Sequence, residues 1–301
     1  LEVRFLHCRI GRLAVPQFIL DEALRTMTAM VLGDRDLKAV VAALGSLRVD
    51  SGGVEAVLVS RGLVDRVLPS LAARLGRNSG MAVRTEAYYR HLVVAARQFP
   101  QEGRFSAFVR AAFALARTRS RDSDPVLENR AAILALAILL GHRRIEHLVG
   151  PVSDDALRSE ARRHMGRVAL SGRPDWCRHY FVSAALALLS NESLSDEAGL
   201  LKEELDAGRG GSGFSFSDLI ADRAGTQFAL AATRDEAAAR RMQSRLADGF
   251  QLNLIFPEAA DLPEGISDEQ LEKDYGGVGG AKYNQVMAEI ERRLAGCEGL
   301  K

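Results

Sequence analysis

One histidine and four carboxylates stand at spacings that could support chemistry: His179, Glu203, Asp206, Asp218 and Asp222. Glu203 and Asp206 are three positions apart and Asp218 and Asp222 are four apart, so each pair shares one face of a helix. Two such helices joined by a tight loop would bring the four carboxylates towards one point. His179 lies on an apolar segment that predicts a third helix, from which its imidazole would reach the same point.

Two kinds of chemistry fit this set of side chains. Carboxylate oxygens with one imidazole suit a hard or borderline divalent cation, and His179, Asp218 and Asp222 are the expected ligands. Such a cation would activate water. Without a metal, a carboxylate in an apolar pocket acts as a general acid because desolvation raises its pKa, and Glu203 or Asp206 would take that role.

The same stretch also has a purely structural interpretation. Ser217 would cap the helix that follows it, and Asp218 would stabilise the positive N-terminus of that helix. Asp222 would pair with a neighbouring arginine, and a single histidine on an apolar face is more often a core residue than a ligand. The glycine-rich run 208–213 would be a connector, because no Gly-Lys-[Ser/Thr] follows it to make a phosphate loop. Spacing alone favours this structural interpretation.

The order of short motifs between residues 173 and 225 adds a resemblance. The pattern reads His179 … Gly199-x-x-Lys202-Glu203-x-x-Asp206 … Ser212-Gly213-Phe214-Ser215-Phe216-x-Asp218-Leu219-x-Ala221-Asp222-x-x-Gly225. It resembles the YfiM-like family of bacterial envelope lipoproteins, whose members show an early His, a Lys-Glu-x-x-Asp and a Phe-Ser-[Trp/Phe]-x-Asp-Leu element ending in Gly. The resemblance covers under a fifth of the chain.

The resemblance implies a location on the periplasmic side of the bacterial cell envelope and a shared site, but no reaction. This chain departs from the family pattern at two places. Trp176 and Cys177 precede the histidine, and the polar residues Asn191 and Glu192 follow its helix.

Composition limits the partners of the protein. The 301 residues include 40 Lys and Arg against 39 Asp and Glu, so no general excess of positive charge favours nucleic acid. The longest apolar run, residues 131–140, is too short for a bilayer, which takes about 20 residues. The sequence begins at Leu1, and membrane attachment is expected only through an anchor absent from this chain.

The three cysteines, Cys8, Cys177 and Cys297, lie far apart without a Cys-x-x-Cys spacing. A zinc ribbon, a thioredoxin motif and a haem attachment site are therefore not indicated. One disulfide with one free thiol and a fully reduced state both stay open.

Hydrophobic periodicity predicts a mainly α fold, with a multi-helical body and a small N-terminal α+β cap. Alternating residues at 3–7, 47–50 and 54–59 predict strands in the cap, with a hairpin around Ser51-Gly52-Gly53 and helices at 16–32 and 34–44. Elsewhere the pattern predicts helices near 88–99, 105–116, 124–140, 153–166, 175–190, 195–207, 217–232, 235–248 and 281–295. The expected domains are residues 1–62, 63–170 and 171–301, of which the last two would also fit a single domain.

Two functions follow from these features. The first is a non-enzymatic envelope protein that binds another envelope protein or a cell-wall component, with its carboxylates stabilising loops and helix ends. The second is a hydrolase, acting on cell-wall glycan through Glu203 or Asp206, since a Glu at a helix end before a Gly-rich loop is similar to the catalytic acid of lysozyme-like enzymes. Hydrolysis needs these carboxylates to face a groove, whereas the first function, which we favour, predicts that other side chains or backbone N–H groups occupy them.

Overall fold

The computed structural model describes residues 79–100, 102–190 and 213–301, together with four short strands in the first 58 residues. Contacts divide the chain into two compact units, Leu1–Arg74 and Leu75–Lys301. The predicted boundary near residue 62 lies outside the described residues and stays a prediction. Residues on both sides of the predicted boundary at 170 belong to the second unit.

In the first unit, the backbone forms two antiparallel pairs. Strand β1 (Cys8–Ile10) pairs with β2 (Leu13–Val15), and β3 (Leu44–Asp50) pairs with β4 (Gly53–Leu58). The second pair occupies the segments in which alternation predicts the hairpin. The remainder of the expected cap, with its strand at 3–7 and its helices at 16–32 and 34–44, lies outside the described residues.

The second unit is mainly helical in its described part, as the periodicity predicts. Its helices are α4 (Ser79–Ala95), α5 (Arg104–Arg119), α6 (Pro125–Leu136), α7 (Ile145–Val149), α8 (Asp155–His164), α9 (Pro174–Ser190), α11 (Phe216–Thr233), α12 (Glu236–Asp248), α13 (Asp268–Tyr275) and α14 (Ala281–Ala295). The described part also contains the short 3-10 turns η2 (Ala96–Gln98), η4 (Leu252–Leu254) and η5 (Glu298–Leu300) and a π turn, η3 (Ala137–Gly141). None of the described helices is long and apolar enough to cross a membrane.

Side-chain caps fix where several helices begin. The Asp124 carboxylate accepts the backbone N–H groups of Val126 and Leu127, and Pro125 occupies the first helical position of α6, as predicted. Asp154 and Asp235 cap α8 and α12 in the same way. Because each cap satisfies N–H groups that the helix itself leaves unpaired, these aspartates set the register of the buried faces.

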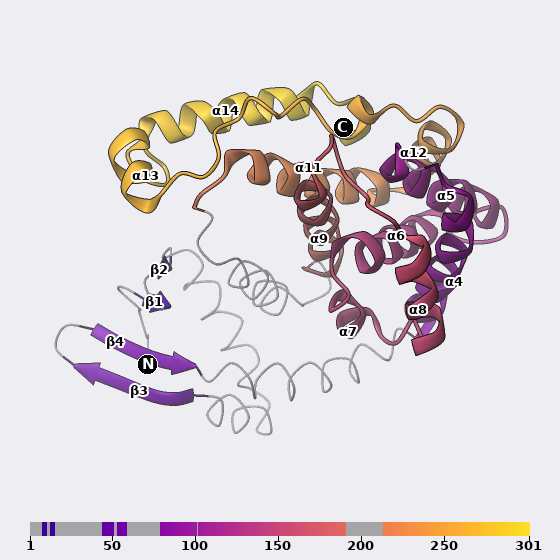
Figure 1. The fold of residues 1–301 in the computed structure, drawn as a ribbon, viewed down its shortest axis with the longest axis horizontal. Coiled ribbons are helices and arrows are strands. Elements are labelled where there is room, and N and C mark those ends of the chain that lie inside the picture. The colour runs from indigo at the N-terminus through magenta and orange to yellow at the C-terminus, as the bar shows by residue number, and fades with distance from the viewer. Residues whose placement is uncertain are drawn as a thin grey trace. The chain divides into compact units, whose positions relative to one another are not determined.

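Part of the core lies where α9 and α11 cross, with α6 packed against both, α12 and α14 against α11, and α4 and α5 against α6 (Figure 1). Aromatic side chains fill the crossing. The Tyr180 ring contacts Phe181, Phe228 and Phe256 and is fully buried. These residues bury large apolar surfaces, which is the main source of stability for such a core.

The predicted helix 124–140 changes geometry before its end. α6 is regular to Leu136 and continues as the π turn η3, where the residue after the turn, His142, leaves the helix. Periodicity did not reveal the short helices α7 and α13, because one or two turns carry too few apolar repeats. The helix predicted at 195–207 lies outside the described residues.

Candidate functional site

The candidate site lies on the crossing of α9 with α11, whose backbones approach unusually closely at Gly225. A Cβ atom at this position would lie 1.9 Å from the carbonyl oxygen of Tyr180, so a side chain here would force the helices apart. Glycine therefore permits the contact that brings polar residues of α9 against those of α11.

His179 on α9 lies between two carboxylates of α11. Its Nδ1 is 3.0 Å from Oδ1 of Asp222, at hydrogen-bonding distance, and its Nε2 is 3.4 Å from Oδ2 of Asp218, an ion-pair distance without hydrogen-bond geometry. Ser183, one turn further along α9, donates its hydroxyl to the same Asp222 oxygen at 2.7 Å. The structure thus brings together three of the five residues that sequence spacing singled out.

The two carboxylates keep His179 protonated. Burial alone would lower its pKa, because the side chain is only 9% exposed, but Asp218 and Asp222 outweigh this and raise the pKa from 6.5 to about 9. At neutral pH the imidazolium therefore neutralises part of the negative charge of α11. The helices are joined by a buried cation between two anions.

This geometry bears on the expected metal ligands His179, Asp218 and Asp222. Within the described ranges, no group of three or more His, Cys, Asp or Glu side chains has an arrangement that could hold a metal ion. Both imidazole nitrogens face carboxylates, whereas a metal ligand needs one deprotonated nitrogen directed at the metal. A metal site that also draws on residues 191–212 stays a prediction.

Glu203 and Asp206, the expected catalytic carboxylates, lie outside the described residues. The geometric test that separates hydrolysis from binding therefore stays a prediction for these two residues. The other two carboxylates that spacing singled out, Asp218 and Asp222, are described. Both of these face side chains of α9, and Asp222 accepts from two of them.

The start of α11 is held by a second polar group, which differs in detail from the predicted cap. Ser215, rather than Ser217, caps the helix by accepting the N–H of Asp218 at 3.0 Å. Ser217 donates instead to Glu264 at 2.9 Å, and Glu264 also accepts from Arg173. The prediction of Ser217 as the cap is therefore wrong, because its hydroxyl donates to Glu264, which lies 47 residues away and gives no local signal.

Arg173 extends this group to the start of α9. It forms an ion pair with Asp175 at 2.6 Å, and its guanidinium lies over the ring of Trp176 at 5.0 Å. The pKa of Asp175 is lowered, chiefly by its hydrogen bonds with Arg173. These contacts fix the first turn of α9 and so the position of His179.

A second buried charge cluster, which the sequence did not single out, lies between α4, α5 and α6. The Glu128 carboxylate is fully buried and accepts from the Tyr88 hydroxyl at 2.7 Å and from Arg119 Nε at 2.7 Å. Arg84 also donates to it and to Ser123. Burial acts to raise the pKa of Glu128, but the hydrogen bonds from Arg119 and Tyr88 outweigh burial and lower it.

The cysteines of the described part contribute no redox pair. Cys177 and Cys297 are both buried and free, and burial raises the pKa of the Cys177 thiol to about 12. A thiol of this kind is a small apolar side chain rather than a nucleophile. The side chain of Cys8 lies outside the description.

Comparison with known proteins gives no relative from which a role for these residues could be transferred. Neither protein-family models, nor curated proteins, nor solved structures match this chain.

Proposed function

We propose that this chain is a non-enzymatic binding or structural protein of the bacterial cell envelope. In this proposal the helical body is a scaffold, the N-terminal α+β cap adds a surface, and together they bind another envelope protein or a cell-wall component. The observation that carries the non-enzymatic part is the mutual pairing of His179, Asp218 and Asp222.

The pairing supports a scaffold because it occupies the polar side chains of the α9–α11 crossing, which would otherwise face a substrate. A general acid or base must reach the proton of a substrate within hydrogen-bonding distance. Asp222 has one carboxylate oxygen directed at both His179 and Ser183, and His179 is 8% exposed. Substitution of His179 or Asp222 would therefore first weaken the contact between α9 and α11.

The envelope location rests on the resemblance alone. The matching residues in the described part, Phe214, Phe216 and Gly225 among them, serve the packing of α11, with Phe216 fully buried and Gly225 against α9. A family that shares them would share this helix crossing, and the cellular location is inferred with it.

Two measurements test the proposal. Elemental analysis is made of the purified wild type and of the variants His179→Ala and Asp222→Ala, and we expect no stoichiometric metal in the wild type. Both variants are expected to have a lower free energy of unfolding than the wild type. Stoichiometric metal that is lost in both variants would contradict the scaffold role. Fractionation of cells that produce the full-length protein is expected to place it with the envelope, and recovery with the cytoplasm would contradict the location.

A hydrolase is the second candidate, and one observation favours it. Among the described residues, Nε2 of His179 is buried without a hydrogen-bond partner, so within this part of the chain the imidazolium holds a proton that faces Asp218 at 3.4 Å without being donated to it. If the segment that carries Glu203 and Asp206 brings substrate there, this proton is available to a leaving group. Release of soluble fragments from purified cell-wall glycan, abolished by Glu203→Gln or Asp206→Asn, would establish this candidate in place of the first.

A further inference from the structure

We propose that residues 162–167, the basic loop, form a surface that docks on anionic phospholipid headgroups. This inference rests on the proposed envelope location and names one component of the envelope that the body contacts. It departs from the sequence-based expectation that only an anchor would attach the protein to a membrane. The basic loop contains Arg162 and Arg163, in the last turn of α8, and Arg167, three residues after that helix ends, and all three are exposed.

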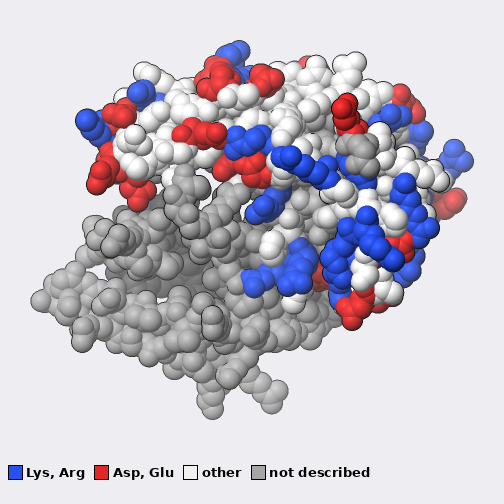
Figure 2. Space-filling view, viewed as in Figure 1, with Lys and Arg blue, Asp and Glu red and all other residues white. Residues whose placement is uncertain are grey.

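Charge is unevenly divided within the second unit. Residues 79–190 contain 17 Arg and no Lys against ten Asp and Glu, whereas residues 213–301 contain 15 Asp and Glu against ten Lys and Arg. Figure 2 shows Lys and Arg side chains gathered over the side on which α8 lies in Figure 1. The near-neutral total of the chain therefore hides a locally basic face.

The three arginines of the basic loop have no carboxylate partner within the described part of the chain. Arg162 donates only to the Ser159 hydroxyl, and no ion pair involves Arg163 or Arg167. The neighbouring acids are already engaged, because Glu160 pairs with Arg97 and Asp155 pairs with Arg158. Three guanidinium groups are thus free to bind an external anion.

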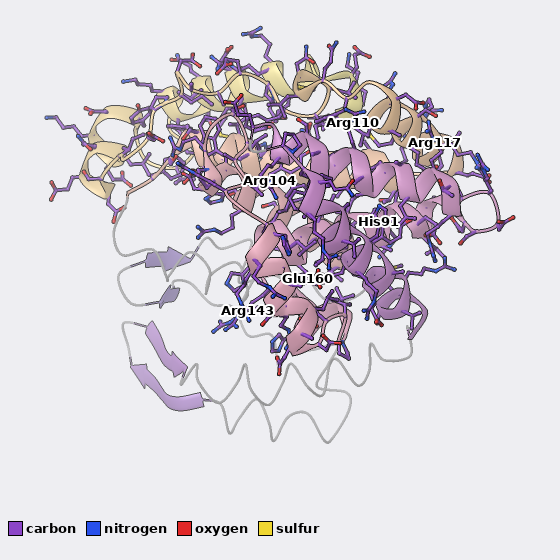
Figure 3. All side chains as sticks on the ribbon, turned by 45° about the vertical axis from the view of Figure 1, so that its right-hand side comes forward. His91, Arg104, Arg110, Arg117, Arg143 and Glu160 are labelled. Atoms are coloured by element: carbon purple, nitrogen blue, oxygen red, sulfur yellow. The ribbon has the colours of Figure 1, made fainter. Side chains whose placement is uncertain are left out.

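A fourth arginine lies beneath the loop. Arg104 is 4% exposed, and its guanidinium donates to carbonyl oxygens only: those of Ala96, Phe99, Pro100, His164 and Met165. These carbonyls end the α4–η2 segment and α8, so Arg104 holds two helix ends together and fixes the backbone of the basic loop. Figure 3 labels Arg104 and, on the adjoining α8, Glu160. No carboxylate of the described residues pairs with Arg104, so its charge adds to the positive potential of the loop.

Phosphate headgroups suit this surface better than nucleic acid does. Guanidinium groups recognise phosphate oxygens in pairs, and anionic membranes attract clusters of exposed arginine. Met165 and Val168 are half-buried beside the arginines and provide apolar contact at an interface. Among the described residues, the exposed large hydrophobic side chains include no aromatic ring on which a base could stack.

Co-sedimentation with lipid vesicles tests the inference. The variant Arg162→Gln/Arg163→Gln/Arg167→Gln is compared with Arg110→Gln/Arg121→Gln/Arg241→Gln, which removes the same charge from exposed positions outside the loop. We expect the wild type to bind vesicles of phosphatidylglycerol and phosphatidylcholine at least about tenfold better than phosphatidylcholine alone. The loop variant should lose at least about tenfold of this binding and the control less than about twofold.

Several results would overturn the inference. They are an absence of vesicle binding, equal losses in both variants, and a preference for duplex DNA over anionic vesicles. If the protein fractionates with the envelope but does not bind vesicles, docking of the basic loop on lipid is disproved and the proposed function still holds. Vesicle binding by a cytoplasmic protein would instead overturn the proposed function.

Discussion

The two buried charge clusters of the helical unit have opposite polarity. In one, the Glu128 carboxylate is surrounded by Arg84, Arg119 and Tyr88. In the other, the His179 imidazolium lies between Asp218 and Asp222. In both clusters, groups on neighbouring helices neutralise a buried charge. The clusters differ in the number of hydrogen bonds that the central charged group makes.

The difference shows which cluster acts as a clamp, that is, which one holds its helices together in a single protonation state. Glu128 has hydrogen bonds to both carboxylate oxygens, from two neighbouring helices, α4 and α5, and is fully buried. His179 has one hydrogen bond to a carboxylate and one longer ion pair, and a net charge of −1 remains on the cluster when the imidazole is protonated. The second cluster therefore responds to protonation, whereas the first is set by its two arginines.

The largest expected effect is that of Glu128→Ala. Removal of the carboxylate leaves Arg84, Arg119 and Tyr88 without their shared acceptor, and loss of one partner of a buried ion pair costs about 3–5 kcal/mol. Chemical denaturation should show this loss in the free energy of unfolding. The control Glu86→Ala removes an exposed pair with Arg90 and should cost no more than about 0.5 kcal/mol. Similar small losses in both variants would show that the Glu128 cluster is not a clamp.

The second largest effect is expected for Gly225→Ala. The added Cβ would separate α9 from α11 and so disrupt the histidine cluster without changing any of its residues. The added Cβ would meet the Tyr180 carbonyl, a backbone atom that cannot move aside alone, and we expect a loss of about 3 kcal/mol. Gly80→Ala is the matched control, because Gly80 is exposed in α4 with no atom within 4 Å of the added Cβ. It should stabilise the protein by about 0.5–1 kcal/mol. A neutral Gly225→Ala would contradict the close approach.

The pH dependence of stability separates the clusters. The pKa of His179 is raised on folding from 6.5 to about 9, so its contribution is complete below pH 6.5 and is lost as the pH rises through 9. The loss amounts to at most about 3 kcal/mol, at 1.36 kcal/mol for each pKa unit. The pKa of Glu128 is lowered, so its contribution is complete at neutral pH and is lost only as the pH falls through its folded value.

Denaturation from pH 6 to pH 10, with His179→Gln alongside, checks this prediction. The variant should lack the fall in stability between pH 6.5 and 9 that the wild type shows. Parallel curves would mean that His179 is not a bridging imidazolium.

The smallest expected effect is that of Ser183→Ala, which removes one donor to Asp222. We expect a loss of about 1 kcal/mol, the usual value of one hydrogen bond. Ser244→Ala, on the exposed face of α12, should change the free energy of unfolding by less than about 0.5 kcal/mol. Equal effects would show that the Ser183 hydroxyl does not support the histidine cluster.

Local sequence signals predicted one cluster and not the other for a physical reason. His179, Asp218 and Asp222 lie on helices with strong periodicity, and their types and spacing suggest a meeting point. Ser183 stands four residues after His179 on the same helix face, so the same argument could have included it. What spacing did not supply was the protonation state, which depends on burial and on the orientation of both carboxylates.

Glu128 gave no such signal. It stands near the start of a helix, where an acidic residue is expected at the surface because it favours the positive helix end. Its burial depends on Tyr88 and Arg84, 40 and 44 residues earlier, and on Arg119. Only tertiary packing decides whether such a carboxylate faces water or arginine, and the choice of Ser215 as the cap of α11 depends on distant Glu264 in the same way.

The most direct test of the scaffold account is an NMR titration of the His179 imidazole, assigned by comparison with His179→Gln. The account predicts protonation of both ring nitrogens at neutral pH and a midpoint near pH 9. A midpoint near the ordinary value of 6.5, or a ring nitrogen that stays unprotonated at neutral pH, would contradict it and would reopen the metal-assisted hydrolase.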